Sequence, residues 1–215
     1  MVKDDITIGV IGIQGAVSEH VAMMKQVFLC NNDVKGNVHV IRPSDSLDGV
    51  DGVILPGGES TTISRVLQSC GLFDELKDRV VNDSLVIMGT CAGCILLASE
   101  LEVDDEHVNL LEFMKMKVQR NAYGPQKESF EQGLDISSID SADSSLFPAV
   151  FIRAPVIVDV WGENTNVLAF DSFQKPVLVQ QDNLLALTFH PELSFDDRIH
   201  SYFLSMVKKF LKMKT

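Results

Sequence analysis

Residues 85–93 read Leu85-Val86-Ile87-Met88-Gly89-Thr90-Cys91-Ala92-Gly93. The first four are an apolar run typical of a strand buried on both faces of a parallel sheet. The Gly-x-Cys-x-Gly that follows has the form of a nucleophile elbow, in which glycines relieve crowding in a sharp strand-to-helix turn. We therefore expect Cys91 at the start of a helix that runs to Glu100, where the helix dipole favours a thiolate. The alternative interpretation is one more buried cysteine after a core strand.

Strands and helices alternate on the N-terminal side of this stretch. Apolar runs predict strands, and helical spacing of apolar residues predicts helices, the first of them capped by Ser18. This alternation predicts an α/β fold with three layers, a doubly wound and mostly parallel sheet with helices on both faces. The expected strands are Ile6–Ile13, Val38–Ile41 and Gly52–Leu55, and the expected helices are Ser18–Leu29, Thr61–Ser69 and Phe73–Val81.

The C-terminal half is expected to be rich in strands. The chain then closes with a helix from Asp196 to Lys212 that carries an apolar stripe of Ile199, Phe203, Met206 and Phe210. Since no linker or repeat interrupts the pattern, we expect a single domain over residues 1–215. The β-type runs lie at Met116–Arg120, Ala149–Val160, Asn166–Phe173, Pro176–Gln181 and Leu184–Phe189.

Composition limits the classes of partner. The 215 residues include 18 Lys and Arg against 30 Asp and Glu, a formal charge of −12, which disfavours nucleic acid and anionic membranes as partners. The uncharged stretch 84–99 is shorter than the ~20 residues of a membrane span. The charged start, Met1 to Asp5, does not resemble a signal sequence. With four cysteines in a chain of this length, we expect reduced thiols and a cytoplasmic location.

Phe189-His190-Pro191-Glu192 supplies a candidate base for the cysteine. A residue before proline is pushed toward extended geometry, so His190 and Glu192 can project to one side and approach each other. Glu192 would then orient the imidazole of His190, which would serve Cys91. A histidine at a strand end is more often structural, and that is how we interpret the remaining histidines: His20, His39, His107 and His200.

A glycine pair follows another expected strand, in Leu55-Pro56-Gly57-Gly58-Glu59-Ser60-Thr61-Thr62. Successive glycines allow the backbone to approach a ligand closely and offer unhindered N–H groups, which an oxyanion hole needs. The N–H groups of Gly58 and Ala92 are the candidates. The alternative is a plain turn in which Ser60 or Thr61 caps the next helix.

Two other patterns indicate different activities. Cys91-Ala92-Gly93-Cys94 is also the C-x-x-C of a dithiol oxidoreductase, but that interpretation leaves His190 and the glycine pair unexplained. The run from Gly9 to Gly15 resembles a dinucleotide loop, yet its spacing is not G-x-G-x-x-G.

Six segments spanning nearly the whole chain, in this order, carry a resemblance to a known family: Gly12-Ile13-Gln14-Gly15-Ala16, Leu55 to Thr62, Gly89 to Gly93, Gln119-Arg120-Asn121, Phe151-Ile152-Arg153-Ala154-Pro155 and Phe189-His190-Pro191-Glu192-Leu193. They resemble the class I, or triad, glutamine amidotransferases, whose fold is flavodoxin-like, and within them the glutaminase subunits of pyridoxal 5'-phosphate synthase. Ile95, where many other triad amidotransferases have glutamine, favours that branch.

The resemblance implies a glutaminase with a Cys-His-Glu triad. Cys91 would be the nucleophile, His190 the base and Glu192 its orienting partner, with hydrolysis to glutamate and ammonia through a γ-glutamyl thioester. It implies no metal and no organic cofactor. The residues implied to line the glutamine pocket are Gly58, Glu59, Ser60, Arg120, Ile152 and Arg153.

The resemblance also implies partners for the enzyme. Ammonia would pass to a synthase subunit that makes pyridoxal 5'-phosphate, within a large hetero-oligomer. The alternative acceptor is another ammonia-using synthase. The loop Asn31–Asn37 looks longer than in compact members of the family, and its part in such an assembly stays open.

Overall fold

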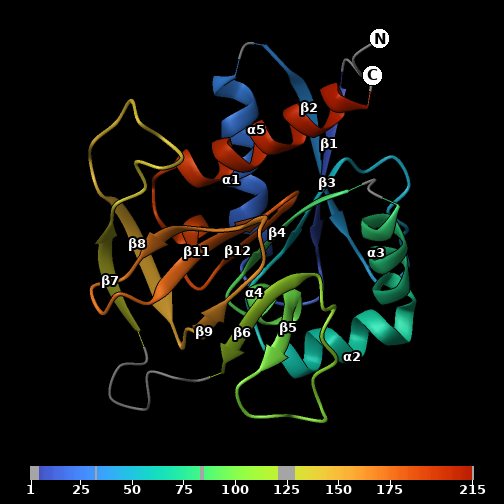
Figure 1. Cartoon of the computed structure of the whole chain (residues 1–215). Coiled ribbons are helices and arrows are strands. Elements are labelled where there is room, and N and C mark those ends of the chain that lie inside the picture. Colours follow the sequence, from blue (N-terminus) through green and yellow to red (C-terminus); the bar gives the residue numbers. More distant parts are fainter. Residues whose placement is uncertain (1–4, 32, 83–84, 121–128, 215) are drawn as a thin grey trace.

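A seven-stranded sheet forms the centre of the molecule (Figure 1). The computed structural model describes residues 5–31, 33–82, 85–120 and 129–214, and the number of strands refers to these ranges. In spatial order the strands are β10 (Thr165–Phe170), β11 (Pro176–Gln181), β12 (Leu184–Leu187), β4 (Val86–Thr90), β3 (Gly52–Leu55), β1 (Asp5–Ile11) and β2 (Lys35–Ile41). The last five strands run parallel to one another, while β10 and β11 add an antiparallel edge, so the predicted mostly parallel sheet is confirmed.

Helices cover both faces of this sheet, as expected for a three-layer fold. On one face lie α1 (Val17–Cys30) and α5 (Arg198–Met213), together with the hairpin of β7 (Ser129–Leu134) and β8 (Phe147–Ile152). The other face carries α2 (Ser60–Cys70), α3 (Leu72–Val81), α4 (Ala92–Leu97) and a small sheet of β5 (Ala98–Leu101), β6 (Met114–Gln119) and β9 (Val156–Val160). Figure 1 shows α1 and α5 on the opposite side of the central strands from α2.

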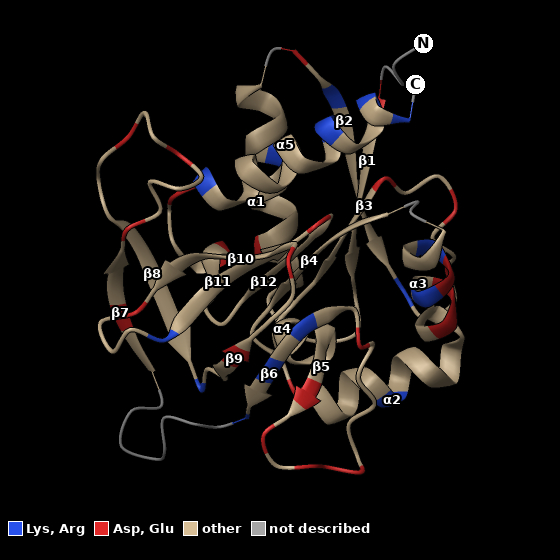
Figure 2. Ribbon diagram, viewed as in Figure 1, with Lys and Arg blue, Asp and Glu red and all other residues tan. Residues whose placement is uncertain are grey.

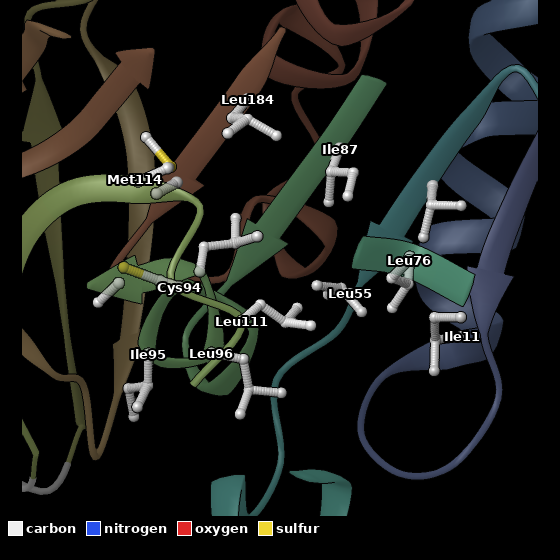
Figure 3. Close-up of a cluster of buried hydrophobic side chains, with 14 of the residues drawn as sticks. Ile11, Leu55, Leu76, Ile87, Cys94, Ile95, Leu96, Leu111, Met114 and Leu184 are labelled. Carbon is white, nitrogen blue, oxygen red and sulfur yellow. The ribbon is translucent and has the colours of Figure 1, made fainter. Parts of the chain in front are cut away.

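The two faces are built from alternate residues of the same strands. In β4, Ile87 joins the cluster under α2, α3 and α4, whereas Val86 and Met88 join the cluster under α1 and α5. Successive strand side chains point to opposite faces, so an apolar run fills both cores at once. Figure 3 shows the first cluster, in which Cys94 lies among aliphatic side chains contributed by α4 and the central strands.

The helix expected over Ala92–Glu100 is shorter than predicted. It ends at Leu97, and the chain continues directly as β5. Ala98 is already extended and pairs with Met114 of β6. Since this pairing joins segments that are distant in the sequence, local helical spacing could not predict it.

The expected strand Ala149–Val160 is two strands in two different sheets. It breaks after Ile152 at Arg153, whose φ of 41° turns the chain between β8 and β9. Uniform β-propensity hides such a break, because a left-handed residue other than glycine carries no clear sequence signal. Strand β7 was not predicted at all.

Two expectations near α1 are also wrong. Ser18 does not cap the helix, which begins at Val17 after Ala16, and its hydroxyl donates instead to Glu19. The loop expected over Asn31–Asn37 is shorter, since β2 starts at Lys35 and pairs with β1. Within the predicted segments, Met1 to Asp4, Asn32 and Asn121 lie outside the described residues.

Acidic residues are distributed over the outer segments, with red segments on β5, on the loop after it and on α3 (Figure 2). Within the described ranges, no helix has the length and apolar character required to cross a membrane. The loop after β5 matters for the site, because it carries Asp105.

Candidate active site

The predicted site residues gather at one edge of the central sheet. Strands β3, β4 and β12 are parallel neighbours, and the glycine pair, Cys91 and His190 each follow one of their carboxyl ends. In open α/β sheets, ligands bind outside this edge. The sheet therefore brings together three segments that are far apart in the chain, Gly57 and His190 being more than 130 residues apart.

Cys91 occupies a strained turn between β4 and α4. Its φ of 50° and ψ of −103° lie outside the favoured regions, and its N–H donates to the carbonyl oxygen of Leu187 at 2.8 Å. A Cβ on Gly93 would lie 2.1 Å from the Leu55 carbonyl oxygen, and one on Gly89 would lie 2.7 Å from the Gly93 backbone. The two glycines are therefore required by close backbone packing, which holds the cysteine in a conformation that functional residues often adopt.

Glu192 hydrogen-bonds the imidazole of His190. Oε1 of Glu192 lies 2.8 Å from Nδ1 of His190, and both side chains are buried. The predicted contact is present, but its geometry differs from the expected extended pair. Pro191 begins a single 3₁₀ turn that brings Glu192 back toward the ring, while the N–H of His190 donates to the Val150 carbonyl oxygen at 2.8 Å.

The pKa of His190 is strongly shifted. Burial alone would lower it, but the side-chain hydrogen bonds with Cys91 and Glu192, and the negative charges of these two groups, raise the pKa of His190 from 6.5 to about 10. The imidazole is therefore protonated at neutral pH and faces Cys91 as an imidazolium.

Cys94 has a different environment, although it belongs to the same C-x-x-C. It is fully buried in the core under α4, and burial, reinforced by the neighbouring Cys91, raises the pKa of the Cys94 thiol far above its usual value. A thiol that stays protonated is a poor nucleophile. All four cysteines are unpaired, and the raised pKa of Cys94 makes it a poor partner for thiol–disulfide exchange.

The glycine pair closes one side of the site. A Cβ on Gly57 would lie 2.5 Å from Cε1 of His190 and 3.3 Å from Cβ of Cys91, so this backbone passes directly over both side chains. Gly58 has a φ of 133°, which favours glycine, and the N–H of Glu59 donates to the side chain of Gln14 at 3.0 Å. Of the two expected oxyanion donors, Gly58 lies in the loop after β3 and Ala92 is the first residue of α4.

Arg120 and Glu59, both predicted for the glutamine pocket, form an ion pair with 3.0 Å between Nη2 and Oε1. Nη1 of Arg120 also pairs with Asp105, which the sequence interpretation missed because no motif marks it. An Arg beside two carboxylates offers charges of both signs, which a zwitterionic amino acid needs. The pair links the loop after β3 to the end of β6.

The other predicted pocket residues lie around the cysteine in different ways. The carbonyl oxygen of Ile152 is 3.9 Å from Sγ of Cys91, and the adjoining Arg153 is exposed at the break between β8 and β9. Ser60 is buried at the first position of α2, and Ala92 is buried at the first position of α4. In the described part of the chain, no group of three or more His, Cys, Asp or Glu side chains is placed to hold a metal ion.

Comparisons with known proteins identify a family. The SNO glutamine amidotransferase family matches residues 10–209. A protein named pyridoxal 5'-phosphate synthase subunit PdxT from Thermococcus onnurineus (strain NA1) is 46% identical over 199 residues, 93% of this chain and 98% of that protein. The protein of the same name from Pyrococcus furiosus is 45% identical over 202 residues, 94% of this chain and 99% of that protein.

Solved structures are similar in the same way. A crystal structure of a glutamine amidotransferase has a TM-score of 0.79 and 40% sequence identity, and the match covers 93% of this chain and 98% of the other. A glutamine amidotransferase from Thermotoga maritima has a TM-score of 0.57 at 13% identity, covering 96% of this chain and 95% of the other. At that identity the second match supports the fold alone.

Proposed function

The chain belongs to the SNO glutamine amidotransferase family, and we propose that it hydrolyses glutamine with Cys91, His190 and Glu192 as its triad. The observation that carries this assignment is the position of Cys91 in the strained turn after β4, beside a protonated His190 that Glu192 holds at 2.8 Å. Nucleophile, proton-transfer group and orienting carboxylate thus have the relation that triads on unrelated folds share.

The first half of the reaction forms a thioester. The Cys91 thiolate attacks the side-chain amide carbon of glutamine, and the carbonyl electron pair moves onto oxygen. The N–H groups of Gly58 and Ala92 are proposed to stabilise this oxyanion. His190 then gives its proton to the amide nitrogen, the carbon–nitrogen bond breaks, and ammonia leaves behind a γ-glutamyl thioester.

The second half regenerates the thiolate. His190, now neutral, accepts a proton from water as the water oxygen attacks the thioester carbon. The second tetrahedral intermediate collapses with loss of the Cys91 thiolate, which restores the thiolate–imidazolium pair and releases glutamate. Both steps use the same oxyanion donors, so one constellation serves the whole cycle.

Substrate recognition is proposed to use the charged pair of Arg120 and Glu59. Arg120 would bind the α-carboxylate of glutamine and Glu59 its α-ammonium group, so substrate would replace the ion pair that now joins them at 3.0 Å. Ile152 and Arg153 would border the pocket from the end of β8, and Ser60 from the start of α2.

The ammonia is proposed to serve pyridoxal 5'-phosphate synthesis. The relatives that share nearly the full length at about 45% identity carry the name of a subunit of that synthase. We propose that this chain is the glutaminase subunit, that it docks on a synthase subunit within a large hetero-oligomer, and that it works in the cytoplasm. Four unpaired cysteines are in keeping with a reducing compartment.

Trapping the thioester tests the proposed chemistry. The full chain is mixed with glutamine and quenched in acid, and intact and peptide masses are measured. A glutamyl adduct on the peptide that contains Cys91, together with release of glutamate and ammonia in equal amounts, is expected. An adduct on Cys30, Cys70 or Cys94 would contradict the mechanism, and affinity capture that brings down an unrelated ammonia-using synthase would contradict the proposed acceptor.

A further inference from the structure

Two buried histidines lie behind Glu192, on the side away from Cys91. Nε2 of His20, on α1, is 3.3 Å from Oε2 of Glu192, and Nδ1 of His20 is 3.0 Å from Nε2 of His200, on α5. Both imidazoles have 0% exposure. A line of polar groups therefore runs from Cys91 through His190 and Glu192 into the core between α1 and α5.

Burial makes this arrangement costly unless its hydrogen bonds are satisfied. Oε2 of Glu192 is buried and has no aligned hydrogen bond among the described residues, and Nε2 of His20 lies 3.3 Å from it. The same nitrogen lies 3.3 Å from Oγ1 of Thr90, the residue before the nucleophile. His20 is therefore within reach of the second oxygen of the carboxylate that orients the triad base.

The tautomers follow from which atoms lack partners. Within the part of the chain that the structure describes, Nδ1 of His200 has no hydrogen-bond partner, so it is better placed as a bare acceptor than as a buried N–H. His200 then carries its proton on Nε2 and donates to Nδ1 of His20. His20 in turn carries its proton on Nε2, which lies 3.3 Å from both Oε2 of Glu192 and Oγ1 of Thr90. The opposite assignment would put a lone pair against the carboxylate. A small rotation of the imidazole that turns its Nε2–H from Thr90 toward Glu192 is all that the contact requires.

The pKa shifts show that both imidazoles are neutral. Burial, with smaller contributions from His200 and His190, lowers the pKa of His20 well below 6.5, and burial lowers the pKa of His200 to about 3. Both rings are therefore neutral at physiological pH, and each carries one proton. A neutral N–H donor can hydrogen-bond Glu192 without neutralising its negative charge, and that charge stabilises the imidazolium of His190.

We propose that His20 is a positioning residue that holds Glu192 through Oε2, and that His200 sets the tautomer in which His20 can do so. The inference rests on the proposed triad and adds a role for two side chains that local sequence marks only as structural. In metal sites, the groups that orient a metal ligand through a hydrogen bond change affinity or activity by about 10- to 100-fold when removed, and we expect an effect at the lower end of that range here.

The test replaces His20 by residues that keep or remove its donor. His20→Met fills a similar volume without an N–H, whereas His20→Gln keeps an N–H at the reach of Nε2. For His20→Met we expect kcat to fall by about tenfold with KM unchanged, and His20→Gln to recover most of kcat. His39→Asn, on the exposed face of β2, is the matched control and is expected to behave as wild type.

Two readouts separate positioning from packing. The pH dependence of Cys91 alkylation by iodoacetamide has an inflection where His190 loses its proton, expected near pH 10 in wild type. In His20→Met this inflection moves toward 6.5, because a loosened Glu192 supports the imidazolium less. In a Glu192→Gln background, adding His20→Met should lower kcat little further, because His20 is proposed to act on His190 only through the carboxylate of Glu192.

An unmoved inflection, or a full tenfold loss in the Glu192→Gln background, would overturn the proposal. If His20→Met does not fold, ¹⁵N NMR of the wild-type histidines decides: unprotonated Nδ1 on His20 and His200 supports the assignment, and a protonated Nδ1 on His20 contradicts it. Retained glutaminase activity in Cys91→Ala would instead contradict the proposed function. The NMR tautomers do not depend on turnover, so the two failures are distinguishable.

Discussion

Two cysteines that are three residues apart, Cys91 and Cys94, have different environments, and that difference decides which of them can act as a nucleophile. Cys91 lies in a strained conformation beside a protonated His190, whereas Cys94, three residues later, points into an aliphatic core. The positions before and after this turn must be glycine, because neighbouring backbone leaves no room for a Cβ at Gly89 or Gly93. That close packing holds Cys91 in its conformation. The reactivity of each thiol therefore depends on its surroundings, since both residues are cysteine.

Replacing each cysteine in turn tests that distinction. We expect Cys91→Ala to abolish glutamine hydrolysis, because no other thiol faces His190 among the described residues, and Cys94→Ala to keep most of it. Cys94→Ala should cost stability instead, of order 1 kcal/mol for a small buried side chain. Glutamate release and thermal unfolding of the two variants are the measurements. Equal loss of activity in both would show that the turn does not select the nucleophile.

At the scale of elements, the site is a product of parallel strand order. Strands β12, β4 and β3 are neighbours, so the segments after their carboxyl ends meet, although β12 comes almost a hundred residues after β4. The break between β8 and β9 then places the carbonyl oxygen of Ile152 at the cysteine. Helices α1 and α5 contribute His20 and His200, and His20 lies 3.3 Å from Oε2 of Glu192.

The loop after β3 offers a direct test of this arrangement. In Gly57→Ala the new methyl would meet Cε1 of His190 at 2.5 Å, so the imidazole must move. A displacement of about 1 Å at a reacting group costs roughly 10²-fold in kcat, and we expect a loss of at least that size with the fold retained. Kinetics and circular dichroism measure the two effects.

Gly71→Ala is the matched control for this variant. Gly71 follows α2 with a φ of 84°, and the space that a Cβ would occupy there is open. Its replacement should lower stability through the left-handed backbone, by roughly 1 kcal/mol, and leave kcat unchanged. Wild-type kcat in Gly57→Ala would mean that His190 does not lie against this loop.

At the scale of the whole molecule, the negative charge limits the kinds of partner, and the buried histidines make stability depend on pH. A formal charge of −12 disfavours polyanionic partners, while the proposed partner is a protein that must receive ammonia without losing it to water. The core under α1 and α5 contains buried neutral histidines, which link the stability of the fold to pH.

Docking is expected to control the rate. Ammonia released without an acceptor is wasted, and a peptide between Gly57 and Gly58 can turn with little steric cost. One misplaced oxyanion donor lowers the rate by about 10²–10³-fold. We therefore expect slow glutamine hydrolysis by the chain alone and marked acceleration by the synthase subunit. Glutamate release at saturating glutamine, with and without that subunit, measures the effect, and full activity of the isolated chain would refute it.

The buried histidines predict acid sensitivity. The pKa of His200 is lowered to about 3 in the folded state, so only the unfolded state takes up a proton below 6.5. This contribution to stability is complete above pH 6.5 and is lost as pH falls toward 3, by at most about 1.4 kcal/mol per pH unit. We expect the free energy of unfolding of wild type to fall more steeply with acid than that of His200→Gln.

Urea unfolding of both proteins at a series of pH values measures this difference. His190 acts in the opposite direction, because its raised pKa contributes stability that is lost only as pH rises toward 10. The His200→Gln comparison cancels that contribution and those of the carboxylates. Parallel stability curves for the two proteins would show that His200 does not stay neutral in the folded state.

The sequence alone was enough to predict the layered α/β fold, the strand-to-helix turn at Cys91 and the contact between His190 and Glu192. These features depend on neighbouring residues: an apolar run, two glycines flanking one position, and a histidine two residues from a carboxylate. Their physical causes act over a few residues, so the pattern of the chain carries them. The expected roles in glutamine hydrolysis came from resemblance and stay predictions for the tests above.

Tertiary structure alone decided the features that join distant segments. Asp105 finds Arg120, and His20 finds Glu192, only because separate elements pack at one edge of the sheet. Pairing with β6 likewise ends α4 at Leu97 and turns the next residues into a strand. A buried polar group is stable only with a hydrogen-bond or ion-pair partner, and the fold decides which residue that is. The free energy of the interaction depends on the distance between the two groups in space, not on their spacing in the chain.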